Sequence, residues 1–275
     1  MIRWQSYSVS LVSREMKDDT AETHAIQPWE SSPEVFTKAA HILGLAHEFE
    51  FMQVLSLEDP LPQNTVALIL VYPTPSDYET QKTANDRLAD CKQSVVCEED
   101  HDIIWLRQRV HNACGPYALL HAIFNSIARE HLSELCSSEQ CESSTADAFA
   151  ARDSLIDTLH ADLKSNATRV HDSIVREHGE LWRVCAQIGE MGESQSLQDL
   201  GDEVEPHFVC FANVGGCLGL FDGDRDDGLR RLDIRLAEGG YIVDGTFEAV
   251  QSHLDTYSSD GRDFCTLLSL THRQM

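Results

Sequence analysis

The sequence is poor in basic residues. Against 46 Asp and Glu it contains only 21 Lys and Arg, which gives a formal net charge of −25. Because phosphate backbones and anionic lipids attract basic surfaces, this balance argues against nucleic acid or a membrane as a partner. It favours a partner with a basic face, although acidity that only keeps the protein soluble explains the charge equally well.

Long hydrophobic runs and a dense cysteine framework are also missing. The longest unbroken apolar run extends from Val66 to Tyr72, which is far too short to span a bilayer. The nine cysteines are odd in number and scattered, so we expect a reducing compartment, the cytoplasm and also the nucleus. No cysteine pair is followed by a second pair at zinc-finger spacing, and we predict neither a metal nor a cofactor.

The 275 residues are enough for one large domain with a sizeable core. Residues 1–25 show little periodicity and are interpreted as a flexible N-terminal extension. Residues 26–275 are predicted to form a single domain. Within it, Gly, Ser, acids and Pro without periodicity over residues 189–206 predict a long acidic loop, of a kind that is usually functional or disordered.

Alternating helical and extended patterns predict an α+β fold, with a central, mostly antiparallel sheet flanked by helices. Ser31 or Ser32 before Pro33 predicts the start of a helix that ends at Gly44. The apolar segment 65–73 predicts a central strand buried on both faces. Residues 115–128 predict a mostly buried helix, and residues 223–240 a charged connection.

Cys114 stands at the start of that buried helix, in "VHNACGPYALLHAIFN". Its thiol could be a small buried hydrophobe, half of a disulfide, a metal ligand or a nucleophile. A buried structural cysteine is the commonest case, and a disulfide or a zinc site fits this sequence poorly. A nucleophile needs a thiolate, which the positive end of a helix stabilises, together with a base and an oxyanion stabiliser.

The segment "HFVCFANVGGCLGLFDG", residues 207–223, supplies a candidate base. Its pattern predicts two strands joined by a Gly-Gly turn. Because such strands fold back on each other, His207 and Asp222 are expected to meet at one edge of the sheet, as a base and its orienting acid. The alternative is that His207 only opens a strand and Asp222 begins a turn with Gly223.

Together these segments resemble the ubiquitin C-terminal hydrolases, the papain-like cysteine deubiquitinases of peptidase family C12. In "QRVHNACGPYALLHAIFN", Gln108 precedes Cys114 by the family's six residues (114 − 108 = 6), and an Asn and a small residue precede the cysteine. The separation of His207 and Asp222 (222 − 207 = 15) matches the family's hairpin. The similarity covers most of residues 28–272.

The resemblance implies a papain-like cysteine protease fold without a cofactor or metal. It also implies hydrolysis of ester, thioester, amide or peptide bonds at the C-terminal glycine of ubiquitin, within ubiquitin-dependent protein catabolism. Cys114 would be the nucleophile and His207 the base and then the acid. Asp222 would orient His207, and Gln108 would stabilise the oxyanion together with the backbone N–H of Cys114.

The partner implied is ubiquitin, whose basic face and arginine-containing tail suit an acidic protein, and we expect a monomer. Acids of the long loop are candidates for contacting it: Glu190, Glu193, Asp199, Asp202, Glu203 and Glu205. The alternative for each of these acids is simple solvation.

Two departures from the family pattern stand out. Pro116 replaces the usual Thr, from which we expect altered local packing but retained chemistry, and the segment after Gly223 lacks the family's prolines and His-Gly. Two other functions stay open: a catalytically silent ubiquitin-binding module, and a hydrolase of another modifier such as NEDD8.

Overall fold

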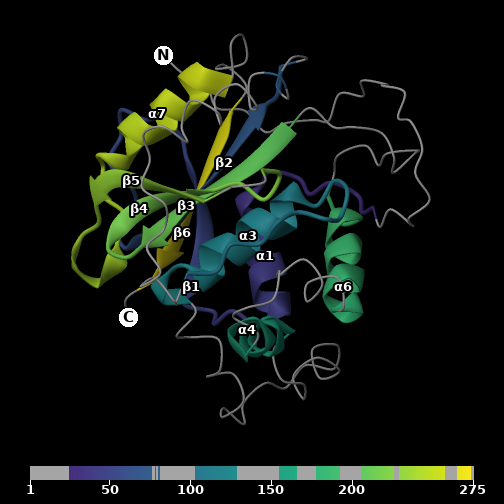
Figure 1. The fold of residues 1–275 in the computed structure, drawn as a ribbon. Coiled ribbons are helices and arrows are strands. Elements are labelled where there is room, and N and C mark those ends of the chain that lie inside the picture. The colour runs from purple at the N-terminus through teal and green to yellow at the C-terminus, as the bar shows by residue number, and fades with distance from the viewer. Residues whose placement is uncertain are drawn as a thin grey trace.

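The structure, a computed structural model, describes residues 25–75, 78, 80, 103–128, 155–165, 178–192, 206–225, 229–257 and 265–273. Over these residues the chain builds one six-stranded sheet in the order β1-β6-β2-β3-β4-β5 (Figure 1). Every pair of neighbouring strands is antiparallel. The strands are β1 (Phe49–Val54), β2 (Thr65–Pro73), β3 (Pro206–Val214), β4 (Cys217–Phe221), β5 (Leu229–Arg235) and β6 (Thr266–His272).

Helices cover both faces of this sheet. In Figure 1, α1, α3, α4 and α6 lie on one side and α7 lies on the other. Their bounds are α1 (Pro33–Leu43), α3 (Cys114–Phe124), α4 (Leu155–Ser165), α6 (Gly179–Gly189) and α7 (Thr246–Tyr257), with a 3₁₀ turn η3 at Glu238–Gly240. The predicted α+β architecture is therefore confirmed.

The central strand β2 shows how one segment serves two cores. Ile69 and Val71 point into the cluster that contains α3, whereas Leu70 and Tyr72 point into the cluster that contains α7. All residues of β2 except Pro73 are buried, as predicted for a strand covered on both faces. Burial of one such aliphatic side chain is worth about 1.5–3 kcal/mol, so this strand contributes to both hydrophobic cores.

The local signals around α1 act as predicted. Ser32 Oγ accepts a hydrogen bond from the backbone N–H of Val35 (3.2 Å), Pro33 lies in the first turn, and Gly44 ends the helix at φ 116. Positive φ of this kind is cheap only for glycine. Just before the helix, the indole N–H of Trp29 donates to the carbonyl oxygen of Cys185 in α6 (2.9 Å). The start of α1 is thereby tied to α6.

Two predictions about element bounds were wrong. The segment expected to be a charged connection contains β5, which pairs with β4 from Phe221 against Leu229 onward. β5 is an edge strand whose side chains are at least partly exposed, and charge is typical of such strands. Helix α3 ends at Phe124 instead of residue 128, because the backbone of Asn125 leaves the helical conformation (φ −111, ψ 30), and its side chain also bonds the carbonyl of His121 (3.0 Å).

Residues 1–24 and 193–205 lie outside the described ranges, so most of the predicted extension and of the acidic loop is not placed. Ala25 forms a parallel bridge with His111, and the N–H of Ile26 donates to the carbonyl oxygen of His111 (3.2 Å). The chain therefore enters the domain beside the segment that leads to Cys114. Within the described ranges, no helix is both long enough and apolar enough to cross a membrane.

Candidate active site

Cys114 is the first residue of α3 and is 7% exposed. Every residue of this helix is buried, which fixes the position of its N-terminus. A Cβ on Gly115 would lie only 3.2 Å from the Cβ of Trp29, so the first turn packs closely against the segment before α1. Pro116 lies in the first turn, where its missing N–H has no intrahelical partner, as expected.

A tight turn delivers the chain to this helix. Asn112 adopts φ 59 in the left-handed region, which Asn tolerates better than most residues, and it is 5% exposed. The hydroxyl oxygen of Tyr117 accepts a hydrogen bond from the backbone N–H of Arg109 (3.2 Å). The turn before Cys114 is thus held against the helix that follows it.

The hairpin forms as predicted and brings His207 against Asp222. Gly215 and Gly216 make the turn, at φ 58 and 78, where side chains would be strained. The Nε2 atom of His207 donates a hydrogen bond to Oδ1 of Asp222 (2.9 Å). The two residues, in β3 and directly after β4, are 8% and 1% exposed, so this pair lies in the interior.

The thiol of Cys114 lies at the beginning of the same strand. Its Sγ is 4.0 Å from the carbonyl oxygen of Pro206, the residue before His207. Burial disfavours a charged imidazole, but Asp222 and then Cys114 outweigh it and raise the pKa of His207 to about 10. Because Nε2 of His207 bonds Asp222, Nδ1 is the nitrogen left to serve the thiol.

Asp222 is held from several sides. Its Oδ1 also accepts the backbone N–H of Asp224 (3.0 Å), and its Oδ2 accepts the Nε–H of Arg225 (3.0 Å). Burial alone would raise the pKa of this carboxyl, but His207 and Arg225 hold it well below its usual range. Arg225 was not predicted from the sequence, although a lone arginine in the short loop after the acid is a signal that could have suggested it.

Gln108 reaches the site from a separate segment. Its backbone N–H donates to the carbonyl oxygen of Gly223 (2.7 Å), which joins it to the end of the hairpin. The Oε1 atom of Gln108 is buried and has no hydrogen-bond partner. A Cβ on Gly223 would lie 3.2 Å from the carbonyl oxygen of Leu106, so the two segments are in close contact.

Two polar residues, His121 in α3 and Asn125 directly after it, fix the segment that carries Gln108. The Nε2 atom of His121 accepts the N–H of Leu106 (2.9 Å), and burial lowers the pKa of His121 to about 4, so the ring is neutral. The side chain of Asn125 accepts the N–H of Ile104 (2.9 Å) and donates to its carbonyl oxygen (2.7 Å). Polar residues four apart on a buried helix face are the signal that sequence reasoning left unused.

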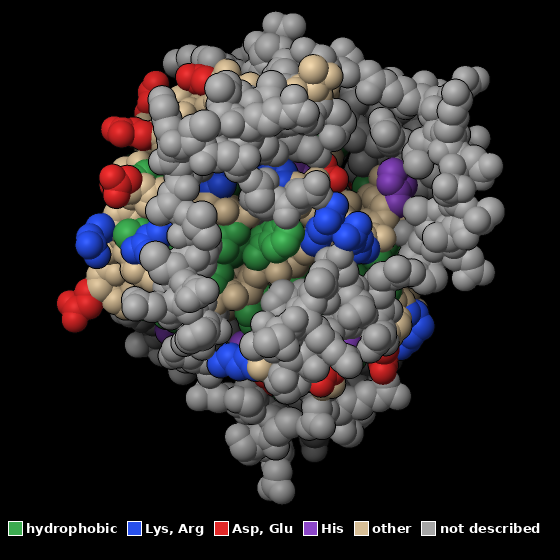
Figure 2. Space-filling view, in the orientation of Figure 1, with side chains coloured by type: hydrophobic (Ala, Val, Ile, Leu, Met, Phe, Trp, Pro, Cys, Tyr) green, Lys and Arg blue, Asp and Glu red, His purple; other side chains and the backbone are tan. Residues whose placement is uncertain are grey.

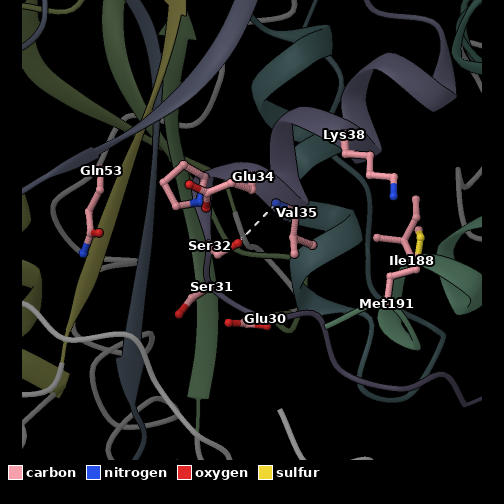
Figure 3. A pocket seen from close by; sticks show the side chains of 10 residues that line it. Glu30, Ser31, Ser32, Glu34, Val35, Lys38, Gln53, Ile188 and Met191 are labelled. Atoms are coloured by element: carbon pink, nitrogen blue, oxygen red, sulfur yellow. Dashed lines mark hydrogen bonds between the residues drawn. The ribbon is translucent and has the colours of Figure 1, made fainter. Parts of the chain in front are cut away.

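A cavity of about 640 Å³ lies where the N-terminus of α1 meets the end of α6 (Figure 3). In Figure 3, Ser31 and Glu30 lie on one side of it, and Lys38 with Ile188 and Met191 on another. Its lining is Glu30, Ser31, Ser32, Pro33, Glu34, Val35, Lys38, Gln53, Ile188 and Met191. The cavity thus combines two carboxylates and hydroxyls with an apolar wall.

Charged side chains are exposed elsewhere on the part of the surface that the structure describes. Figure 2 shows acidic side chains along the edge where α7 and β5 lie. Of the predicted loop acids, only Glu190 lies in the described ranges, where it caps the end of α6. No three or more His, Cys, Asp and Glu among the described residues come together as metal ligands.

A cysteine at a helix N-terminus beside a buried His–Asp pair on an antiparallel sheet is the arrangement of a cysteine hydrolase. The family model described as ubiquitin carboxyl-terminal hydrolase, family 1, matches residues 26–240, and the chain belongs to this family. The predicted family is therefore confirmed.

Individual relatives support this assignment. The chain is 37% identical over 112 residues to ubiquitin carboxyl-terminal hydrolase YUH1 of Saccharomyces cerevisiae, covering 39% of this chain and 43% of that protein. It is 35% identical over 104 residues to a ubiquitin carboxyl-terminal hydrolase of Drosophila melanogaster, covering 36% and 44%. These alignments thus span less than half the length of either relative.

A solved structure extends the likeness to the whole fold. The catalytic domain of Trichinella spiralis UCH37, bound to ubiquitin vinyl methyl ester, matches with a TM-score of 0.56 and 17% identity. The match covers 90% of this chain and 96% of that one. The predicted papain-like fold is therefore confirmed.

Proposed function

We propose that this protein is a cysteine-type deubiquitinase, which hydrolyses the bond at the C-terminal glycine of ubiquitin. The observation that carries the proposal is Cys114 at the N-terminus of α3 beside the buried pair of His207 and Asp222. Membership of the family supports the reaction, and the ubiquitin adduct in the UCH37 structure supports the substrate.

The first half of the reaction is acylation of the thiol. The Cys114 thiolate attacks the glycine carbonyl carbon while His207 carries the thiol proton on Nδ1. The backbone N–H of Cys114 and the side-chain amide of Gln108 stabilise the oxyanion. As the bond to the leaving group breaks, His207 gives its proton to that group, and a thioester joins ubiquitin to Cys114.

The second half reverses these roles. Neutral His207 takes a proton from water, and the hydroxide attacks the thioester carbonyl. Collapse of the second tetrahedral intermediate expels the Cys114 thiolate beside protonated His207 and releases ubiquitin, whose new carboxylic acid loses its proton to solvent. Asp222 holds the imidazole in one orientation throughout.

The cavity beside Trp29 is the proposed place for part of the ubiquitin tail. Glu30 and Glu34 would attract its arginines, and Ile188 and Met191 would contact its apolar side chains. Replacing both glutamates with Gln is expected to raise KM for ubiquitin substrates while kcat changes little. An unchanged KM would exclude this cavity as a substrate site.

The deciding experiment uses ubiquitin with an electrophilic C-terminus. The wild type is expected to become covalently labelled, Cys114→Ser to lose labelling, and Cys217→Ser, at the opposite end of the hairpin, to keep it. A wild type that binds ubiquitin without labelling would instead be the silent module. Parallel hydrolysis of ubiquitin and NEDD8 substrates tests whether another modifier is preferred.

The same proposal includes a monomeric protein that works in the cytoplasm and also in the nucleus. Sedimentation at several concentrations tests the first part, and a single species of about one chain's mass is the expected result. Imaging of the fluorescently labelled protein in cells tests the second.

A further inference from the structure

Arg225 is an unusually deep cation behind the His–Asp pair. Its side chain is 1% exposed, and its Nε–H donates to Oδ2 of Asp222 (3.0 Å). Its guanidinium also lies over the ring of Tyr257, 4.7 Å from the centroid. Because a buried guanidinium is unfavourable unless it is paired, this residue and Asp222 must be considered as one unit.

Aromatic rings from other elements enclose that unit. Tyr72 and Tyr78 contact each other through their hydroxyls (3.3 Å), and their rings lie 5.8 and 5.7 Å from that of His207. On α7, His253 lies 4.9 Å from Tyr257 and 5.1 Å from Tyr72. Water is therefore kept away from the side of Asp222 that Arg225 contacts.

The enclosing groups are neutral. Burial, and after it the charge of Asp222 or of the partner phenol, raises the pKa of Tyr72 and Tyr78 well above the ordinary value. Burial lowers the pKa of His253 to about 3. His121, on α3, is neutral as well.

Among the described residues, few other charges act on the pair. The thiol of Cys114 faces His207 from α3, Asp224 lies in the loop, and Arg230 acts from β5 on His253. Within that part of the chain, Arg225 is therefore the cation, besides His207 itself, that bonds the Asp222 carboxylate.

We propose that Arg225 is a positioning residue, which keeps Asp222 ionised and aligned and thereby lets His207 release its proton during turnover. This inference rests on the proposed hydrolase function. It explains how the negative charge of the buried Asp222 carboxylate stays balanced both when His207 is protonated and when it is neutral.

The charge balance gives the reason. With a Cys114 thiolate and protonated His207, the four buried groups sum to zero charge, because Asp222 and Arg225 cancel. When His207 gives its proton to the leaving group, Asp222 still has a cationic partner. Without Arg225, the whole charge of Asp222 would act on the imidazolium and hold its proton more tightly. Proton release, and the general-base step that needs neutral histidine, would then slow.

The test compares Arg225→Gln and Arg225→Lys with the control Arg231→Gln. Arg231 lies in β5 and contacts the turn at the opposite end of the hairpin. Each variant is assayed with ubiquitin carrying a fluorogenic amide at its C-terminus, from pH 5 to 11. For Arg225→Gln, we expect the alkaline limb of kcat/KM to move up by about one pH unit.

The same variant is expected to lower kcat at neutral pH about tenfold. This loss is smaller than the whole rate enhancement that general acid–base catalysis typically gives, about 10²–10⁴-fold. Arg225→Lys retains the charge but not the planar guanidinium donor. Its alkaline limb of kcat/KM should therefore lie at the wild-type pH, while its kcat stays low. The control should match the wild type in both quantities. A folded Arg225→Gln whose alkaline limb stays in place would overturn the proposal, even if kcat falls.

Tyr257→Phe covers the case in which Arg225→Gln does not fold. It keeps the ring under Arg225 and removes the hydroxyl, which raises the pKa of Arg225, so a smaller shift of the limb in the same direction is expected. No shift in this variant would also contradict the proposal. A wild type that hydrolyses no ubiquitin substrate would instead disprove the hydrolase function itself.

Discussion

The backbone N–H of Leu106 donates a hydrogen bond to Nε2 of His121 across a separation of 15 residues. With Asn125 one helical turn further on, this bond makes α3 the support for both sides of the proposed oxyanion site. The helix presents Cys114 at its start, and farther along it holds the segment that carries Gln108.

Asn125→Ala should therefore affect both stability and chemistry. The change removes the bonds to the N–H and the carbonyl of Ile104 and leaves both groups buried without their partner. We expect the free energy of unfolding in urea to fall by about 2–4 kcal/mol and kcat to fall with it. In the control Asn213→Ala, which loses a bond in the β3–β4 turn, kcat should stay near the wild-type value. Equal kcat in both variants would show that α3 does not position Gln108.

Gln108→Ala tests the oxyanion site directly. If the side-chain amide donates to the oxyanion, its loss should lower kcat by about 10²–10³ while KM changes little. Gln251→Ala, on an exposed part of α7, serves as the matched control. Steady-state hydrolysis of a fluorogenic ubiquitin substrate measures both, and a loss below threefold for Gln108→Ala would remove it from the proposed machinery.

Mild acid should destabilise the fold through two buried histidines. Burial lowers the pKa of His121 to about 4 and of His253 to about 3, so below pH 6.5 these two rings bind more protons in the unfolded chain than in the folded one. Stability from these rings is present above pH 6.5 and is lost as pH falls toward those values. Between pH 7 and 5 we expect a loss of about 2 kcal/mol for each ring, measured by urea unfolding.

Variants separate the two histidines. His121→Asn and His253→Asn should each remove about half of the loss in unfolding free energy between pH 7 and 5. His41, half-buried and with its pKa also lowered by burial, contributes in the same direction to a lesser degree. A wild type equally stable at pH 7 and 5 would contradict the buried, neutral state of these rings.

Trp29→Phe should loosen the contact between the start of α1 and α6. It keeps most of the packing against Phe36 (5.4 Å) but leaves the carbonyl of Cys185 without its donor. We expect about 1–3 kcal/mol of lost stability in urea. Because Trp29 also packs on Gly115, kcat should fall modestly, and a variant with unchanged stability would show that this bond contributes nothing.

The main parts of the site could be predicted because each depends on a local pattern. A Gly-Gly turn between two apolar segments fixes the hairpin register, and that register brings His207 to Asp222. A helix that begins at Cys114 is equally visible, since Pro116 fits only the first turn. These elements can be predicted because the patterns that specify them involve residues adjacent in the sequence.

Other parts depend on contacts that no local pattern reveals. Arg225 reaches Asp222 through the shape of a short loop, and its ring partner Tyr257 comes from a helix on the other face of the sheet. β5 was not predicted because its charged residues resembled a connecting loop. An edge strand pairs with a neighbouring strand on one side only, so charged side chains are compatible with it. The cavity joins Glu30 to Gln53 and Met191, three segments that only the fold assembles.

The bridge between Ala25 and His111 has a practical consequence. The bridge holds Ala25 next to the turn that leads to the proposed nucleophile, so a tag fused directly to Ala25 in a shortened protein would lie close to Cys114. A tag placed after β6, which pairs with β1 at the edge of the sheet, leaves from a different strand. Assays of the proposed hydrolysis with such a shortened protein should therefore use a tag at that end.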